Sequence, residues 1–116
     1  MHDDSLKITA TTVRVPVFYS HSKSINVELQ NEFDIDELKQ LLSDSEGLIV
    51  QDDPKNSVYP MPIYCADKDE VFVGRIRRDE SVKSGINMWV VADNIRKGAA
   101  TNAVQIARKL VEYWNE

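Results

Sequence analysis

Alternation of apolar and polar residues is the main secondary-structure signal along this chain, and it predicts five β-strands. The pattern is clearest where Val13, Val15 and Val17 alternate with other residues. Gly74 interrupts a later pattern, which indicates a β-bulge at that position. The predicted strands cover residues 8–18, 24–30, 48–50, 70–77 and 86–92, and residues 54–69 are expected to form an ordered loop or short edge pieces.

Apolar residues at helical spacing occur twice. Asp34 can cap a helix from Ile35 to about Ser43, and Gly47 marks its end. A second helix at the end of the chain places its apolar residues on one face, namely Ala100, Ala103, Val104, Ala107, Leu110, Val111 and Trp114. The order of strands and helices predicts an α/β (α+β) fold with a mixed sheet. We expect the helices to pack mainly on one face of that sheet, and the chain to end in a long amphipathic helix.

The composition excludes several classes of protein. The chain has 116 residues, enough for one domain, and a net charge of −5, which argues against binding to nucleic acid or acidic membranes. We expect no signal peptide and no membrane span, because no apolar run approaches the required length of about 20 residues. The single cysteine, Cys65, excludes an internal disulfide and fits a cytoplasmic location. With only His2, His21 and Cys65 as soft ligands, no metal site is expected.

A candidate site combines Arg14 with His21, which lies seven positions later in a turn-like Ser-His-Ser segment. A guanidinium can bind a carboxylate through two parallel hydrogen bonds, and an imidazole transfers protons near neutral pH. An extended stretch of this length spans about 23 Å. The two side chains can therefore share a small ligand only if the strand breaks at Pro16 or the chain bends between Tyr19 and Ser22. The alternative is a surface arginine and a loop histidine without a common function.

The junction before the last helix is a second candidate. Asp93 and Asn94 directly follow the last predicted strand and supply capping groups, and Gly98 removes one side chain near the helix start. Free N–H groups at such a start can bind an anion or a polar ligand. The alternative is a plain capped amphipathic helix that packs on a core.

Three ordered segments are spread over residues 13–110 of the chain: VRVPVFYSHSKSINVELQ, QDDPKNSVYPMPIYCADKDEVFVGRIRRD and INMWVVADNIRKGAATNAVQIARKL. Together they closely resemble the C-terminal part of bacterial aspartate-semialdehyde dehydrogenases, in particular the Gram-positive branch. The resemblance implies a C-terminal domain like that of glyceraldehyde-3-phosphate dehydrogenase. Residues 1–92 would be part of the substrate-binding and dimerisation domain. Residues 93–116 would form the helix that returns to an N-terminal Rossmann domain, which this chain lacks.

The same resemblance implies roles for three residues. Arg14 matches the arginine that binds the α-carboxylate of the substrate, His21 matches the general acid/base, and Asn94 matches a residue that contacts NADP. The family reduces L-aspartyl 4-phosphate to L-aspartate 4-semialdehyde on the route to diaminopimelate, lysine, threonine and methionine. The resemblance also implies a homodimer.

The chain departs from the family in what it lacks. The nucleophilic cysteine, the glycine-rich dinucleotide loop and the phosphate-contacting residues of the family lie upstream of the matching segments, and the four glycines cannot form G-x-G-x-x-G. Cys65 lies outside the nucleophile motif and is expected to be a small apolar filler. We therefore expect an inactive fragment of the enzyme. The alternatives are an inert dimerisation or interaction module and a small-molecule-binding domain without a redox role.

Overall fold

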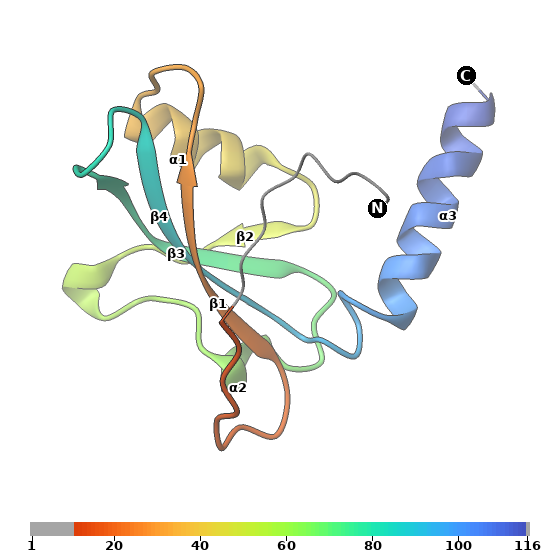
Figure 1. The fold of residues 1–116 in the computed structure, drawn as a ribbon. Coiled ribbons are helices and arrows are strands. Elements are labelled where there is room, and N and C mark those ends of the chain that lie inside the picture. Colours follow the sequence, from red (N-terminus) through yellow and green to blue (C-terminus); the bar gives the residue numbers. More distant parts are fainter. Residues whose placement is uncertain (1–10, 116) are drawn as a thin grey trace.

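A four-stranded sheet forms the centre of the computed structural model, in which the structure describes residues 11–115 (Figure 1). Helices flank the sheet, and one long helix follows it. In chain order the elements are β1 (His21–Glu28), α1 (Ile35–Asp44), β2 (Leu48–Val50), the 3-10 helix η1 (Pro54–Asn56), α2 (Pro62–Cys65), β3 (Val71–Asp79), β4 (Gly85–Ala92) and α3 (Ala100–Asn115).

The strands lie in the order β1-β4-β3-β2. β1 and β4 pair antiparallel along their whole length, from His21 opposite Ala92 to Glu28 opposite Gly85. β3 also pairs antiparallel with β4, whereas the short β2 pairs parallel with β3. The sheet is therefore mixed, and together with the long C-terminal helix it confirms the predicted α/β class.

The predicted bulge at Gly74 is present in β3. The register with β4 shifts between Gly74 and Arg77, and Arg75 has a left-handed backbone conformation with φ at +53°. A Cβ atom on Gly74 would lie 2.1 Å from the carbonyl oxygen of Gln51 and 2.6 Å from Cδ of Pro60. Only a residue without a side chain fits so close to the neighbouring loop.

The two faces of the sheet carry separate hydrophobic clusters, because neighbouring strand residues point to opposite faces. One cluster lies under α1, and the other contains the end of α2. Their buried members are Val73, Ile76 and Ile86 on the α1 face and Cys65, Phe72 and Val91 on the α2 face. The helices thus lie on different faces, and the prediction that they pack mainly on one face is wrong.

Helix α1 begins where the sequence predicts. The Asp34 carboxylate accepts hydrogen bonds from the N–H groups of Asp36 at 2.8 Å and Glu37 at 3.0 Å. The bond from Glu37, followed by the bond from Asp36, lowers the pKa of Asp34. Gly47, with φ at +78°, lies in the turn between α1 and β2, as expected of a residue that ends the helical stretch.

Helix α3 projects away from the sheet (Figure 1), and the residues of its apolar face are exposed. None of its described residues is buried, and Trp114 is 72% exposed. Polar side chains link it to the rest of the chain: Lys109 forms an ion pair with Glu46 at 3.0 Å, and Gln105 accepts a hydrogen bond from Lys97 at 2.7 Å. The polar side of this helix therefore faces the sheet domain.

The first predicted strand is wrong for the residues that the structure describes. Residues 11–18 form no strand, and residues 8–10 lie outside the described part. A strand needs a neighbour to receive its hydrogen bonds, and Pro16 cannot donate one. β1 begins at His21 rather than Ser24 and ends at Glu28 rather than Gln30. The other strands agree with the prediction to within two residues, and the expected loop at 54–69 contains η1 and α2.

Candidate functional site

A small pocket beside the turn that leads to α3 brings two of the three predicted site residues together. His21 and Asn94 both line it, and its volume is about 150 Å³. We call it the His21 pocket. Its other lining residues come from β1, β3, β4 and the turn, and they are Lys23, Val71, Val90, Ala92, Lys97 and Gly98.

The backbone before β1 determines where His21 lies. Ser20 is buried, has φ at +76°, and donates its hydroxyl hydrogen bond to the carbonyl oxygen of Pro62 at 3.3 Å. The left-handed conformation turns the chain just before the strand. His21 is then the first residue of β1, opposite Ala92, and its side chain is exposed. The imidazole is therefore accessible to a ligand.

Asp93 holds the turn that carries Asn94. Its buried carboxylate accepts hydrogen bonds from the N–H groups of Asp67 at 2.8 Å, Ile95 at 2.9 Å and Arg96 at 3.4 Å. The bond from Asp67 is the main cause of a lowered Asp93 pKa, the bonds from Ile95 and Arg96 add to it, and burial opposes it. Asp93 therefore caps this turn and not α3, which begins further along the chain.

The backbone N–H groups at the junction are largely occupied within the chain. Ala99 donates to the carbonyl oxygen of Arg96 at 3.3 Å, and Ala100 donates to that of Ile95 at 3.4 Å. The expectation of free N–H groups at the helix start is therefore wrong for these two residues. Gly98 lines the pocket, so the junction forms part of the pocket wall. Its backbone N–H groups, however, are not all free to bind a ligand.

Arg14 does not line the His21 pocket, and its side chain is exposed in the segment before β1. Its role as a carboxylate ligand stays a prediction. A shared ligand would require a break at Pro16 or a bend between Tyr19 and Ser22, and the structure contains a turn at each place. The N–H of Val17 donates to the carbonyl oxygen of Val15 at 2.9 Å, which forms a tight turn around Pro16, and Ser20 supplies the second turn.

Cys65 is fully buried at the end of α2, where it packs against Phe72 and Val91. Burial raises the pKa of its thiol. A thiolate rather than a thiol is the reactive nucleophile, so this environment makes Cys65 unreactive. The packing fits its predicted role as a small apolar filler.

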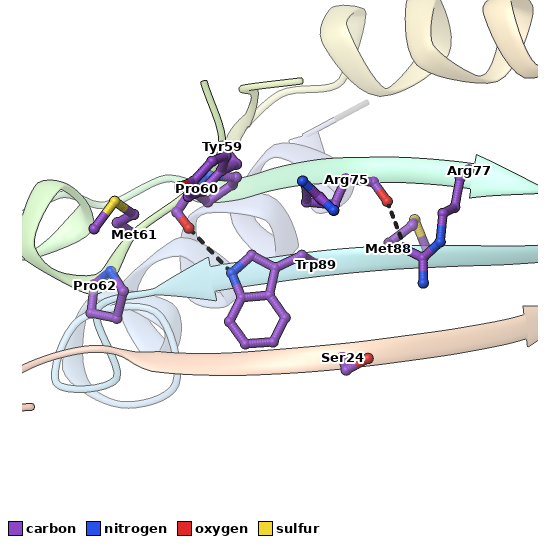
Figure 2. Close-up of a pocket in the computed structure, with 9 residues that line it drawn as sticks. All are labelled: Ser24, Tyr59, Pro60, Met61, Pro62, Arg75, Arg77, Met88 and Trp89. Atoms are coloured by element: carbon purple, nitrogen blue, oxygen red, sulfur yellow. Dashed lines mark hydrogen bonds between the residues drawn. The ribbon is translucent and has the colours of Figure 1, made fainter. Parts of the chain in front are cut away.

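A larger pocket of about 400 Å³ lies on the other face of the sheet, and Figure 2 shows it. We call it the sheet-face pocket. One of its walls is fixed by Trp89, which donates its Nε1–H to the carbonyl oxygen of Pro60 at 3.1 Å. None of the three predicted site residues lines it. The lining residues are Ser24, Tyr59, Pro60, Met61, Pro62, Arg75, Arg77, Met88 and Trp89.

Sequence reasoning did not single out Lys23 and Lys97, although both line the His21 pocket. Strand periodicity could have found Lys23, because it lies two residues after His21 and on the same face. No local signal marks Lys97, since its place depends on the turn that Asp93 caps.

Among residues 11–115, no group of three or more His, Cys, Asp or Glu residues could hold a metal. No helix in this part of the chain is long and apolar enough to cross a membrane.

Comparison with known proteins identifies one family. A family model described as "Semialdehyde dehydrogenase, dimerisation domain" matches residues 1–97. The aspartate-semialdehyde dehydrogenase of Aquifex aeolicus (strain VF5) is 57% identical over 112 residues, which are 97% of this chain and 33% of that protein. The aspartate-semialdehyde dehydrogenase of Bacillus subtilis (strain 168) is 44% identical over 95% of this chain and 32% of that protein.

Solved structures give the same result. The crystal structure of aspartate semialdehyde dehydrogenase II from Vibrio cholerae has a TM-score of 0.77 and 46% sequence identity, over 85% of this chain and 29% of that chain. A second structure of that enzyme, complexed with ASA, matches equally well. This chain spans about a third of the length of the curated relatives that it matches. On these matches and on its fold, the chain belongs to the semialdehyde dehydrogenase family, whose dimerisation domain it contains.

Proposed function

We propose that this chain is the C-terminal part of an NADP-dependent aspartate-semialdehyde dehydrogenase that acts in the cytoplasm as a homodimer. Such an enzyme reduces L-aspartyl 4-phosphate to L-aspartate 4-semialdehyde and releases phosphate. The His21 pocket carries this proposal, because His21 and Asn94 line it together although they lie far apart in the sequence. Membership of the family and the likeness to the Vibrio cholerae structure add support.

His21 is the general acid/base in this proposal. Its imidazole is exposed in the pocket, where a nucleophilic thiol from another part of the enzyme can reach it. His21 takes the proton from that thiol and later supplies a proton to the alkoxide that develops on the substrate carbonyl. NADPH, when bound, supplies the hydride.

Asn94 and Arg14 have binding roles. The Asn94 amide both donates and accepts hydrogen bonds, which fits the carboxamide of a nicotinamide ring. The Arg14 guanidinium pairs with the α-carboxylate of the substrate and orients the carbonyl for attack. Its exposed position and the two turns that follow it leave it free to make that contact.

The proposal divides the chain at the end of β4. Residues 1–92 belong to the substrate-binding and dimerisation domain, and residues 93–116 return to an N-terminal Rossmann domain. Helix α3 supports this division, because its apolar face points away from the sheet while its polar side contacts Glu46 and Lys97. An outward apolar face of this size is suited to packing against another domain.

A chimeric enzyme tests the two binding roles. In it, this chain replaces the matching third of the Aquifex aeolicus relative, and phosphate-dependent formation of NADPH from aspartate semialdehyde is measured. Arg14→Lys keeps the charge but loses the planar fork, so KM for aspartate semialdehyde should rise about tenfold or more. Asn94→Ala should raise KM for NADP or slow hydride transfer, and leave KM for aspartate semialdehyde nearly unchanged.

Arg78→Lys is the matched control for Arg14→Lys, because Arg78 lies in β3 and does not line the His21 pocket. Its kinetic constants should equal those of the parent chimera. If Arg14→Lys leaves KM for aspartate semialdehyde unchanged, Arg14 pairs with a carboxylate of the protein and not with the substrate. If Asn94→Ala changes only KM for aspartate semialdehyde, Asn94 contacts the substrate and not NADP, and its proposed role is wrong.

A second candidate is a module that only associates with itself, and the sheet-face pocket favours it. Tyr59 and Met61 line this pocket and are 38% and 39% exposed, on a face that α1 does not cover. Met61→Glu should then dissociate the 116-residue chain in sedimentation experiments, whereas Leu41→Glu on the outer side of α1 should not. A chain that dimerises in this way, combined with an inactive chimera, would favour this candidate over the enzyme.

A further inference from the structure

Ser20, directly before β1, combines an unfavourable backbone conformation with burial. Its φ of +76° lies in the left-handed region, which residues with a side chain rarely adopt. Ser20 is only 4% exposed, although its neighbours Tyr19 and His21 are both exposed. A conformation of this kind persists only where the surrounding structure holds it. Contacts elsewhere in the chain must therefore fix Ser20.

The contact that fixes Ser20 comes from α2. The Ser20 hydroxyl donates to the carbonyl oxygen of Pro62 at 3.3 Å, across 42 positions of the sequence. Pro62 is the first residue of α2, which lies beside the beginning of β1 (Figure 1). The helix is itself held in place, because its last residue, Cys65, is fully buried in the hydrophobic cluster on that face of the sheet. The hydroxyl thus ties Ser20 to a fixed point.

The position of His21 depends on this attachment. His21 is the first residue of β1, and residues 11–18 form no strand before it. A residue at the end of a strand is held by ladder hydrogen bonds from one side only. Its exposed side chain has few neighbours that could hold it instead. The turn at Ser20 therefore sets where the imidazole leaves the strand.

The same short segment also holds the second half of the candidate site. The N–H of Asp67, two residues after the end of α2, donates to the carboxylate of Asp93 at 2.8 Å. Asp93 directly precedes Asn94, just as Ser20 directly precedes His21. Residues 62–67 are therefore hydrogen-bonded to both residues that lead into the His21 pocket. This arrangement fixes His21 and Asn94 relative to each other.

We infer that Ser20 is a positioning residue, which holds His21 at its place relative to Asn94 through the hydroxyl bond to Pro62. The inference rests on the proposed function, in which His21 is the general acid/base and Asn94 contacts NADP. A general acid/base must lie within hydrogen-bond reach of the proton that it transfers, and a displacement of about 1 Å can cost about a hundredfold in rate. Ser20 acts only through His21 and contacts neither substrate nor cofactor.

Ser20→Gly in the chimeric enzyme is the direct test. Glycine adopts the left-handed conformation without strain, so this variant removes the hydroxyl and leaves the turn possible. Its kcat should fall about tenfold, while KM for aspartate semialdehyde and KM for NADP stay nearly unchanged. The kcat is calculated per folded enzyme, counted by NADP titration of the same sample. A residue with a merely structural role would change the folded fraction and leave this kcat unchanged.

Ser57→Gly is the matched control. Ser57 is also a serine with a left-handed backbone, with φ at +59°, but it is exposed and does not line the His21 pocket. Its kcat and both KM values should equal those of the parent chimera. The inference is overturned if Ser20→Gly has the kcat of Ser57→Gly, or if it raises a KM and leaves kcat unchanged.

A measurement without activity separates this inference from the proposed function. In the 116-residue chain, Ser20→Gly should lower the ¹⁵N order parameter of the His21 amide, whereas Ser57→Gly should not. An otherwise unchanged amide spectrum shows that the variant is folded. An inactive parent chimera would refute the proposed function, and the order parameter then decides whether Ser20 holds His21. An unchanged order parameter in that case would overturn the inference as well.

Discussion

Asp93 is the residue on which the geometry of the candidate site depends most. Its buried carboxylate accepts three backbone hydrogen bonds and ties the turn after β4 to the end of α2. Asp93→Ala would leave those N–H groups without their acceptor, and the free energy of unfolding should fall by about 2 kcal/mol or more. Urea unfolding measures this, with Asp36→Ala, an exposed aspartate in α1, as the control.

The lowered pKa of Asp93 also predicts a dependence of stability on pH. In the folded chain its pKa lies below the ordinary value of 3.8. Its contribution is therefore fully present above the unfolded pKa and is lost as the pH falls through the lower, folded pKa. Asp93→Asn should remove that part of the acid sensitivity below about pH 4. Equal acid sensitivity of Asp93→Asn and the parent chain would show that Asp93 is not responsible.

Cys65 gives a prediction about chemistry rather than geometry. Because its thiol is buried and its pKa is raised, we predict that it takes no part in the reaction of the proposed enzyme. Cys65→Ser should leave kcat and KM of the chimera nearly unchanged, with only a modest loss of stability from a hydroxyl group in an apolar cluster. A large loss of kcat in a folded Cys65→Ser variant would contradict this.

At the scale of single residues, the packing of Cys65 fits its predicted filler role, whereas the surroundings of His21 and Asn94 could not be predicted. The structure places His21 and Asn94 in one pocket and buries Cys65. Lys97 could not be predicted, because its position follows from long-range hydrogen bonds such as that between Asp67 and Asp93. The roles of His21, Asn94 and Arg14 stay predictions.

Among the elements, the bulge in β3 makes the sharpest prediction. Gly74→Ala would place a methyl group 2.1 Å from the carbonyl oxygen of Gln51, so that the backbone must shift. The free energy of unfolding should fall by about 3 kcal/mol. Gly98→Ala is the matched control, because the nearest atom to its new methyl group is the carbonyl oxygen of Asn94 at 3.6 Å. Equal free energies of unfolding for the two variants would show that the carbonyl oxygen of Gln51 does not exclude a side chain at position 74.

Helix α3 predicts uneven hydrogen exchange. Its apolar face is exposed and polar contacts tie it to the sheet domain, so its amides at 100–114 should exchange faster than those of β4 in the 116-residue chain. In the chimera the same amides should become protected, because another domain covers the apolar face. Strong protection of α3 in an isolated monomer would mean that the helix packs within this chain.

The elements differ in how far the sequence determines them. Local signals are sufficient for α1, where the Asp34 cap and the apolar stripe agree, and for the alternating strands β3 and β4. They are not sufficient for residues 11–18, whose alternation predicts a strand. A strand also needs a partner, and sequence alternation shows only which face would be buried.

On the scale of the whole molecule, the surfaces left exposed are as informative as the core. The chain presents the outward face of α3, the sheet-face pocket and the His21 pocket, and it spans about a third of the length of its curated relatives. Composition predicted a small acidic domain and the order of the elements predicted an α/β fold, but neither could predict which faces would stay uncovered. That property depends on how the strands and helices are arranged around one sheet.

The most direct test of the account is kcat of the chimeric enzyme with His21→Asn. Loss of the acid/base should lower kcat by about 10²- to 10⁴-fold and leave KM for aspartate semialdehyde largely unchanged. His2→Asn, at the only other histidine of the chain, should have the activity of the parent chimera. If His21→Asn keeps the kcat of an active parent chimera, His21 is not the general acid/base and the central claim is wrong.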